Sequence, residues 1–267
     1  MIKKKLNGKT ALITGSTRKG IGATTALTLA HYGANIILNY GTGSKGEAAS
    51  KRAAALEKII KKFNKNVLTI AADVTQEKDV QKLFSSGFKK FGSVDILVNN
   101  AGGTWIPQDF AQIKTSHFKQ ATRPEIEGTF FCIREALPLM RKKRWGRIIN
   151  ICLDLKTMEL SLGETPDHIL DKYPYDFALA KYTKQHLTEL ISPLEFKYGI
   201  TCNNILPGII EEMSNEEALE IIQGKREQSF FFNPLDVAET IAYLCSEEAR
   251  SITNSNLNIP GNLYKRI

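Results

Sequence analysis

The sequence contains few cysteines and no long apolar run. Its four cysteines among 267 residues stand far apart, each in an apolar context, and no two form a C-x-x-C pair. This spacing argues against a disulfide framework or a cysteine metal site and favours reduced core thiols. No stretch approaches the ~20 apolar residues of a membrane helix, and no apolar signal region follows Met1. We therefore expect a soluble, cytoplasmic protein with no membrane partner.

The sequence also lacks a dense basic tract, although its net charge is +8. Lysines and arginines are spread along the chain, with small groups only at 3–5, 61–62 and 141–147. Solvated faces explain this pattern better than a nucleic-acid surface. No internal repeat and no metal-ligand spacing is present. With 42% hydrophobic and 24% charged residues, the chain can bury one large core, and we expect a single domain over residues 1–267.

The stretch Thr10–Gly22 reads as a strand, a glycine turn and a helix. An apolar run over 11–13 stops at Gly15, and a helical apolar pattern begins at Ile21, directly after Gly20. Such a turn gathers free backbone N–H groups and the positive end of a helix dipole, which together favour a phosphate. We interpret the stretch as a dinucleotide site, with a tight packing turn as the alternative.

Short apolar segments alternate with longer helical patterns through the rest of the chain. The predicted strands span residues 34–40, 67–71, 94–98, 146–152 and 200–205. The predicted helices span residues 47–63, 76–91, 175–198 and 235–246, with one more ending near residue 141. Near-continuous apolar strands joined by helices predict an α/β fold: a Rossmann-like, doubly wound parallel sheet with helices on both faces. Ligands are expected at the carboxyl ends of its strands.

Small polar or glycine signatures follow the predicted strands. They are Asp73-Val74, the segment Asn99–Gly102 and Pro207-Gly208. Together with the T-G…G-I-G loop, an A-x-x-K helix at Lys181 and the segment Pro234–Ala238, they stand in the order and spacing of one family. Over essentially its whole length, the chain resembles a short-chain dehydrogenase/reductase.

The resemblance implies a nicotinamide dinucleotide cofactor. It places the glycine loop at the pyrophosphate, Asp73 and Val74 at the adenine, the segment Asn99–Gly102 by the adenosine ribose, and Lys181 at the nicotinamide ribose. The expected cofactor-binding residues are Gly15, Thr17, Arg18, Gly20, Ile21, Gly22, Asp73, Val74, Asn99, Ala101, Gly102, Lys181, Pro207, Gly208 and Ile210.

The end of the second predicted strand favours NADP(H) over NAD(H). Relatives that prefer NAD usually carry an acid there to bind both ribose hydroxyls, but this chain has Asn39-Tyr40. A carboxylate would repel a 2′-phosphate, whereas Arg18 of the glycine loop can bind one through a fork of N–H donors. The alternative is that Arg18 and Lys19 only point into solvent.

The resemblance breaks at the catalytic residues. The family has a Tyr four residues before the Lys, a Ser after the fifth strand and an Asn on the preceding helix. Aligned with them, this chain has Phe177, Leu153 and Glu125, or Cys152 at the Ser position if the register shifts by one. A phenylalanine has no proton to donate, so the family's usual carbonyl reduction lacks its acid.

An enlarged segment at about 154–175 offers replacements on the substrate side. Tyr173 is our first choice of acid, because it precedes Pro174 and can reach back from outside the first helical turn. His168 is the second, since an unperturbed imidazole titrates near about pH 6.5; a solvated His is the alternative. The expected catalytic residues are thus Lys181, Tyr173 and His168.

Two functions remain open. One is an NADP(H)-dependent oxidoreductase with an atypical site and a small-molecule substrate, for which an activated C=C or C=N bond would demand less of a proton donor. The other is a family member without redox activity that binds nucleotide, serves as an assembly partner or catalyses a non-redox step. Trp105, Phe110 and residues 230–232 form a substrate wall or simple packing. The resemblance also implies a homodimer or homotetramer through the helices at 129–140 and 177–196.

Overall fold

The structure is a computed structural model that describes residues 5–17, 19–43, 46–154, 173–228 and 232–261. Seven parallel strands form one sheet in the order β3-β2-β1-β4-β5-β6-β7. The strands are β1 Thr10–Ile13, β2 Asn35–Tyr40, β3 Val67–Ala71, β4 Ile96–Asn99, β5 Gly146–Ile151, β6 Ile200–Ile209 and β7 Asn256–Gly261. The chain winds outward from β1 to β3 and then returns to build the other half from β4. The order therefore reverses between β1 and β4, where a ligand crevice is expected.

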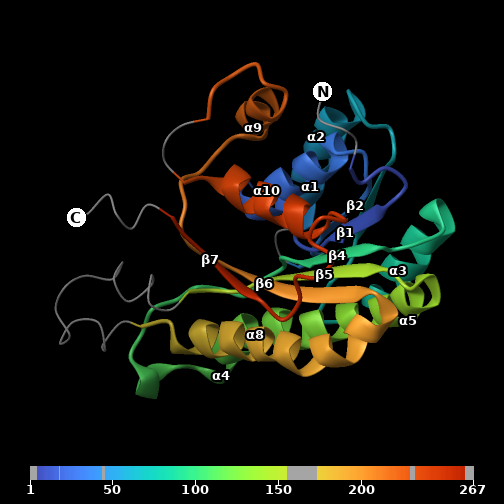
Figure 1. Cartoon of the computed structure of the whole chain (residues 1–267). Helices are drawn as coiled ribbons and strands as arrows, with labels where there is room; N and C mark the ends of the chain where they lie inside the picture. Colours follow the sequence, from blue (N-terminus) through green and yellow to red (C-terminus); the bar gives the residue numbers. More distant parts are fainter. Residues whose placement is uncertain (1–4, 18, 44–45, 155–172, 229–231, 262–267) are drawn as a thin grey trace.

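Helices cover both faces of the sheet (Figure 1). One face carries α1 Ile21–His31, α2 Gly46–Lys61, α9 Asn215–Ile222 and α10 Pro234–Leu244. The other carries α3 Glu77–Phe91, α4 Thr115–Arg123, α5 Thr129–Lys143 and α8 Tyr175–Glu195. Short helical turns occupy Phe110–Gln112, Pro124–Gly128 and Phe196–Tyr198. The predicted doubly wound parallel sheet is confirmed.

Alternate residues of each strand supply the two cores. Ala11 and Ile13 pack with α1 and α10, whereas Leu12 between them packs with α3 and α5. Every residue of β1, β4 and β5 is buried. A strand buried on both sides gains by being apolar throughout, which explains the continuous apolar runs in the sequence.

The turn Pro124–Gly128 is a π-helical turn between α4 and α5. Pro124 has no N–H to donate to the preceding helical turn, so the regular hydrogen-bond ladder is broken there. A single π turn inside a helical run widens it locally and is often found at functional sites. Glu125 stands in this turn and is completely buried.

A row of asparagines crosses the sheet from β4 to β7. Asn99, Asn150, Asn204 and Asn256 are paired residues on successive strands. Asn99 Nδ2 donates to Asn150 Oδ1 at 2.8 Å, and Asn204 Nδ2 donates to Asn256 Oδ1 at 2.7 Å. Between them, Asn150 Nδ2 donates to the Thr188 hydroxyl of α8, which donates in turn to Asn204 Oδ1, each at 2.7 Å. We call these four residues the asparagine ladder.

The prediction that Pro207 and Gly208 follow the sixth strand is wrong, because β6 continues to Ile209. The extension pairs with β7, whose strand was not predicted from N-L-N-I-P-G. The short helices α4 and α9 were not predicted either.

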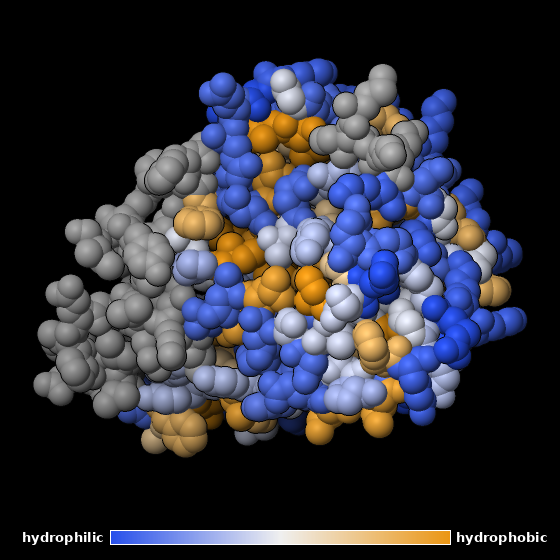
Figure 2. Space-filling view, in the orientation of Figure 1, coloured by the Kyte–Doolittle hydropathy of each residue, from blue (hydrophilic) through white to orange (hydrophobic). Residues whose placement is uncertain are grey.

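Exposed apolar side chains gather on α8. Leu190 and Leu194 are 70% and 63% exposed, and Leu179 and Tyr182 are also exposed. In Figure 2 apolar residues lie along the lower edge of the molecule, where Figure 1 places α8. Among the described residues, no helix is both long and apolar enough to cross a membrane.

Candidate active site

A cavity of about 550 Å³ opens at the carboxyl ends of the central strands, where the strand order reverses. Its wall combines the glycine loop after β1, the loops after β3 and β4, the π turn and the start of α8. The predicted residues that line it are Gly15, Gly20, Ile21, Gly22, Asp73, Val74, Ala101, Gly102, Lys181 and Ile210. The structure thus brings together segments that lie up to 195 positions apart in the sequence, from Gly15 to Ile210.

The glycine loop leaves open space at the beginning of α1. Gly20 is the N-cap of that helix, has φ of 120°, and a Cβ there would meet nothing within 4 Å. Among the described residues, no side chain caps the helix, so its first N–H groups can bind a ligand. Gly15, with φ of 60°, lies so close to the next loop that a Cβ would stand 2.9 Å from the Ala101 Cα. This cradle fits the pyrophosphate of a dinucleotide.

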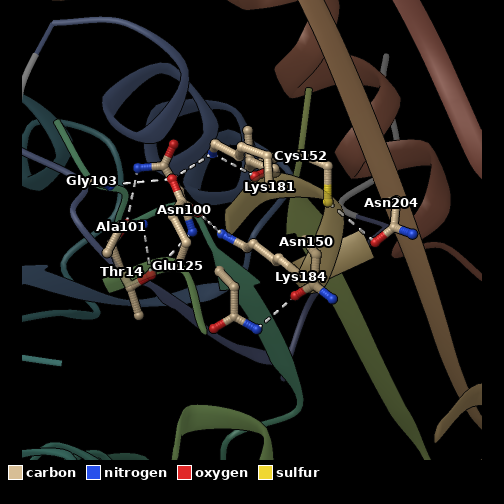
Figure 3. Close-up of polar contacts among 12 residues, drawn as sticks. Thr14, Asn100, Ala101, Gly103, Glu125, Asn150, Cys152, Lys181, Lys184 and Asn204 are labelled. Atoms are coloured by element: carbon tan, nitrogen blue, oxygen red, sulfur yellow. Dashed lines mark hydrogen bonds and ion pairs between the residues drawn. The ribbon is translucent and has the colours of Figure 1, made fainter. Parts of the chain in front are cut away.

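Polar side chains fix the glycine loop to the loop after β4 (Figure 3). The Thr14 hydroxyl accepts hydrogen bonds from the N–H groups of Asn100 and Ala101, both at 3.0 Å. Asn100 Nδ2 donates back to the carbonyls of Thr14 and Gly15, at 2.9 and 3.0 Å. The two loops therefore form one rigid corner of the cavity.

The Asn39 side chain, at the end of β2, is hydrogen-bonded to main-chain groups. Its Oδ1 accepts from Gly15 N–H at 3.2 Å, and its Nδ2 donates to the Ala72 carbonyl at 3.0 Å. The side chain is 1% exposed, so it braces the glycine loop against β3. The position at which NAD-dependent relatives are expected to carry an acid is thus filled by a neutral, fully bonded amide.

A second cavity, of about 750 Å³, adjoins the first. It shares Gly15 and Asp73 with the first and adds Thr17, Tyr40 and Arg52. Lys119 and Arg123 also line the second cavity and Lys19 lines the first, so four cationic side chains, Arg52 included, border this region. Arg18, the residue predicted to bind a 2′-phosphate, lies outside the described residues.

The remaining predicted cofactor residues lie in strands. Asn99 is 2% exposed and belongs to the asparagine ladder, whereas its neighbour Asn100 lines the cavity. Pro207 and Gly208 lie within β6, and Ile210, just after that strand, lines the cavity.

Three charged side chains meet at the cavity wall, two of which line the cavity. Glu125 Oε1 lies 2.8 Å from Lys181 Nζ, and Glu125 Oε2 lies 3.0 Å from Lys184 Nζ (Figure 3). Oε1 also accepts from Gly103 N–H at 3.2 Å, and Lys181 Nζ donates to the Ile151 carbonyl at 2.9 Å. We call Glu125, Lys181 and Lys184 the charged triad.

The electrostatics of the charged triad follow from its burial. Glu125 is 0% exposed, Lys184 1% and Lys181 7%; Glu125 and Lys181 line the cavity, whereas Lys184 does not. Burial alone would raise the pKa of the Glu125 carboxyl, but the ammonium groups of Lys181 and Lys184 outweigh it and lower that pKa. Burial lowers the pKa of Lys184 despite the opposing charge of Glu125. Sequence reasoning placed Glu125 at a catalytic position but missed Lys184, whose only signal was its spacing of three residues from Lys181 on the same helix.

Aromatic rings border the opposite side of Lys181. Phe177 lines the cavity one helical turn before it, with the ring centroid 5.3 Å from Lys181 Nζ. The Trp105 ring packs edge-on against Phe177 at 5.4 Å between centroids. The Tyr173 ring lies 5.0 Å from that of Tyr175. His168, the other predicted proton donor, lies outside the described residues.

Neither residue at the expected serine position offers a hydroxyl. Cys152 is 3% exposed, its Sγ lies 3.5 Å from Asn204 Oδ1, and burial raises the pKa of its thiol to about 11. Leu153 follows it and is half-buried. Within the described part of the chain, no group of three or more His, Cys, Asp or Glu side chains could hold a metal ion.

Comparison with known proteins agrees with this architecture. A family profile described as enoyl-(acyl carrier protein) reductase matches residues 15–261. The 3-oxoacyl-(acyl-carrier-protein) reductase FabG of Staphylococcus epidermidis is 33% identical over 266 residues, covering 96% of this chain and 99% of the relative. The chain belongs to the short-chain dehydrogenase/reductase family.

Other relatives extend the comparison within this family of oxidoreductases. FabG of Aquifex aeolicus is 32% identical, covering 97% of this chain and 99% of its own. A D-beta-hydroxybutyrate dehydrogenase of Rhizobium meliloti is 29% identical, covering 95% and 97%. A solved Bacillus thuringiensis structure, described as a candidate 3-oxoacyl-reductase, superposes with a TM-score of 0.75 at 25% identity, covering 94% of this chain and 96% of the other.

Proposed function

We propose that this short-chain dehydrogenase/reductase is an NADP(H)-dependent oxidoreductase that acts on an acyl-type small molecule through an atypical site. The observation that carries the proposal is the position of Lys181. Its ammonium lines the same cavity as the uncapped N-terminus of α1, and the charged triad holds it there. When bound, a reduced nicotinamide dinucleotide would supply a hydride to an electrophilic carbon of the substrate.

The cofactor would be held by the residues of both cavities. The glycine loop and the first turn of α1 suit the pyrophosphate, and Asp73 and Val74 border the space proposed for the adenine. Lys19 and Arg52 support a 2′-phosphate, together with Arg18 as predicted from the sequence. The neutral Asn39 amide at the end of β2 offers no repulsion to that phosphate.

The proton for the reaction is proposed to come from a group other than the one the family normally uses. Phe177 presents hydrocarbon one turn before Lys181, so Lys181 Nζ is the proton-bearing group that lines the cavity at this point. An ammonium can stabilise negative charge developing on a substrate oxygen and can donate a proton to it. Tyr173, close to the start of α8, is the alternative donor that we keep.

The substrate is proposed to carry an activated double bond next to an acyl carbonyl. The relatives are named for 3-oxoacyl and 3-hydroxybutyrate chemistry, and the family profile is named for enoyl reduction. Hydride addition to a conjugated C=C bond places the negative charge on the acyl oxygen, which demands less of a proton donor than direct carbonyl reduction. Trp105 and Phe177 supply an apolar wall for the acyl chain.

Cofactor binding tests the first part of the proposal. NADPH and NADH are titrated separately while the fluorescence of the reduced nicotinamide is followed. We expect the NADPH complex to be tighter, and Arg18→Ala and Arg52→Ala each to weaken NADPH by about 1.5 to 3 kcal/mol without affecting NADH. Lys89→Ala on α3 is the matched control. Equal affinity for both cofactors would contradict the preference, and binding of neither would contradict the function.

A non-redox role is the second candidate, favoured by the hydrocarbon ring of Phe177 beside Lys181. The two functions can be distinguished by following the absorbance of NADPH over time, once with a short enoyl thioester and once with a short 3-oxoacyl thioester. Oxidation of NADPH by either supports the oxidoreductase, whereas tight NADPH binding with no turnover of either supports the non-redox alternative.

We also propose a homodimer or homotetramer in the cytoplasm. The exposed apolar side chains of α8 and Phe130 of α5, which is 47% exposed, support a partner copy on this face. The four free, buried cysteines support a reducing compartment.

A further inference from the structure

We infer that Glu125 and Lys184 act as a matched pair that sets the position of Lys181 and the net charge of its surroundings. Glu125 holds the Lys181 ammonium, and Lys184 compensates the second oxygen of Glu125, so that the charged triad keeps one net positive charge at the cavity wall. Both are positioning residues in this account: Lys184 does not line the cavity, and Glu125 lines it but has both carboxylate oxygens engaged by the two lysines, so that it acts through Lys181. The inference deepens the proposed function and rests on it only for the role of Lys181 in catalysis.

The contacts of Glu125 leave it no freedom. Its Oε1 accepts from Lys181 Nζ and Gly103 N–H, and its Oε2 faces Lys184 Nζ at 3.0 Å. The carboxylate comes from the π turn, and both lysines come from one face of α8, separated by three residues. Glu125 therefore joins the π turn to α8 in the wall of the cavity.

The direction of Lys181 follows from these contacts. An ammonium has three N–H donors. One is used on Glu125 Oε1 and one on the Ile151 carbonyl, at 2.8 and 2.9 Å. The third remains for the cavity that Lys181 lines. Without Glu125, the Lys181 ammonium would lose one of the two contacts that orient it, and its third N–H would no longer be directed into the cavity.

The charges explain why Lys184 accompanies Glu125. A carboxylate facing Lys181 alone would cancel its charge and leave Oε2 buried without a donor. Lys184 satisfies that oxygen and restores a single positive charge, which suits an anionic cofactor and a developing oxyanion. Conversely, Lys184 is 1% exposed and would be a buried, unpaired cation without Glu125. Removing either residue alone therefore leaves a buried charge unpaired and lowers the stability of the fold. This is the behaviour expected of two energetically coupled residues.

A double-mutant cycle tests the coupling without substrate or cofactor. Glu125→Gln, Lys184→Met and the double variant keep side-chain volume close to the original. Since each single change leaves a buried group unpaired, we expect each to lower the thermal unfolding midpoint by about 10 °C, and the double variant to lose clearly less than the sum. Lys143→Met is the control: it breaks the Lys143–Asp95 pair of 2.8 Å, which lies just before β4, at the opposite end of the strands from the cavity. Additive losses would overturn the coupling.

The chemical reactivity of Lys181 tests its positioning. Acetylation by a small reagent needs the neutral amine and is measured by peptide mass spectrometry, relative to exposed Lys89. Glu125→Gln replaces the carboxylate that engages Lys181 Nζ at 2.8 Å by a neutral amide, so the Lys181 side chain is held less tightly and acetylation should speed up about tenfold. Lys184→Met removes a like charge, so acetylation should slow. A purely structural loosening would speed both, and that outcome would overturn the inference.

These outcomes are separable from the proposed function. Opposite changes in Lys181 reactivity with no NADPH binding would leave the charged triad intact as an inference and refute the oxidoreductase. NADPH binding and turnover with unchanged Lys181 reactivity in both variants would support the oxidoreductase and refute the positioning role.

Discussion

Replacing Phe177 by tyrosine should raise the turnover of simple carbonyl substrates. The ring lies one helical turn before Lys181, with its centroid 5.3 Å from the Nζ, and it lines the cavity. The added hydroxyl would therefore stand close to an ammonium in a site that keeps one net positive charge. This is the arrangement in which a phenol becomes a better acid, because nearby positive charge stabilises the phenolate.

The magnitude follows from Coulomb's law. At roughly 5 Å and an effective dielectric constant of about 20, one net positive charge stabilises a phenolate by about 3 kcal/mol. That energy would bring the pKa of a phenol at this position from about 10 to about 8. A positioned general acid is worth about 10² to 10⁴ in rate, so even a poorly oriented hydroxyl should give a measurable gain.

The assay is NADPH oxidation with a short 3-oxoacyl thioester at neutral pH. Phe110→Tyr is the matched control, because that ring is 71% exposed and lies against Tyr175. We expect a gain of at least about tenfold for Phe177→Tyr and none for the control. If turnover is unchanged while NADPH still binds, the missing hydroxyl does not limit the reaction, and the reasoning from Phe177 is refuted.

Three further outcomes are expected. If the proton donor has moved to the enlarged segment, Tyr173→Phe or His168→Ala should abolish the native reaction. The affinity for NADPH, measured by titration, should stay the same. Unchanged turnover in both variants would exclude a proton donor in this segment. The pKa of the Glu125 carboxyl is lowered in the folded state. Its contribution to the free energy of unfolding is therefore fully present above the unfolded-state pKa of about 4.3, and it is lost as the pH falls through the lower pKa of the folded state. The thermal unfolding midpoint should drop at acid pH in the wild type and drop less in Glu125→Gln. Leu190→Glu, at a 70% exposed position of α8, should convert the proposed dimer to monomer in light scattering, and an unchanged mass would place the interface elsewhere.

Much of the fold could be predicted because the strands are buried on both sides. The run Gly146–Ile151 is entirely buried, and its isoleucines at 148, 149 and 151 made it recognisable as a strand although it also holds Arg147 and Asn150. The last strand was missed because N-L-N-I-P-G carries two asparagines and a proline and has only short apolar stretches. Its pairing with β6 depends on neighbours far along the chain, which a local pattern does not contain.

The candidate site was predicted where backbone conformation dominates and missed where tertiary contacts do. The glycine loop is readable because Gly15 and Gly20 adopt positive φ angles that favour glycine. The sequence did not show which of Asn99 and Asn100 lines the cavity, because successive residues at the end of a strand point to opposite faces of the sheet. The partnership of Glu125 and Lys184 joins positions 59 residues apart, and it exists only because the π turn is packed beside α8.

The asparagine ladder has a consequence for how the sheet can assemble. Its four side chains meet only when β4, β5, β6 and β7 are aligned in a single way, and a slip of one residue would turn them to the opposite face. A slipped strand would then bury amide groups with no partner, at a cost of several kcal/mol in all at about 1 to 3 kcal/mol each. The ladder therefore selects one register of the strands. That register in turn fixes the placement of the loops that form the cavity.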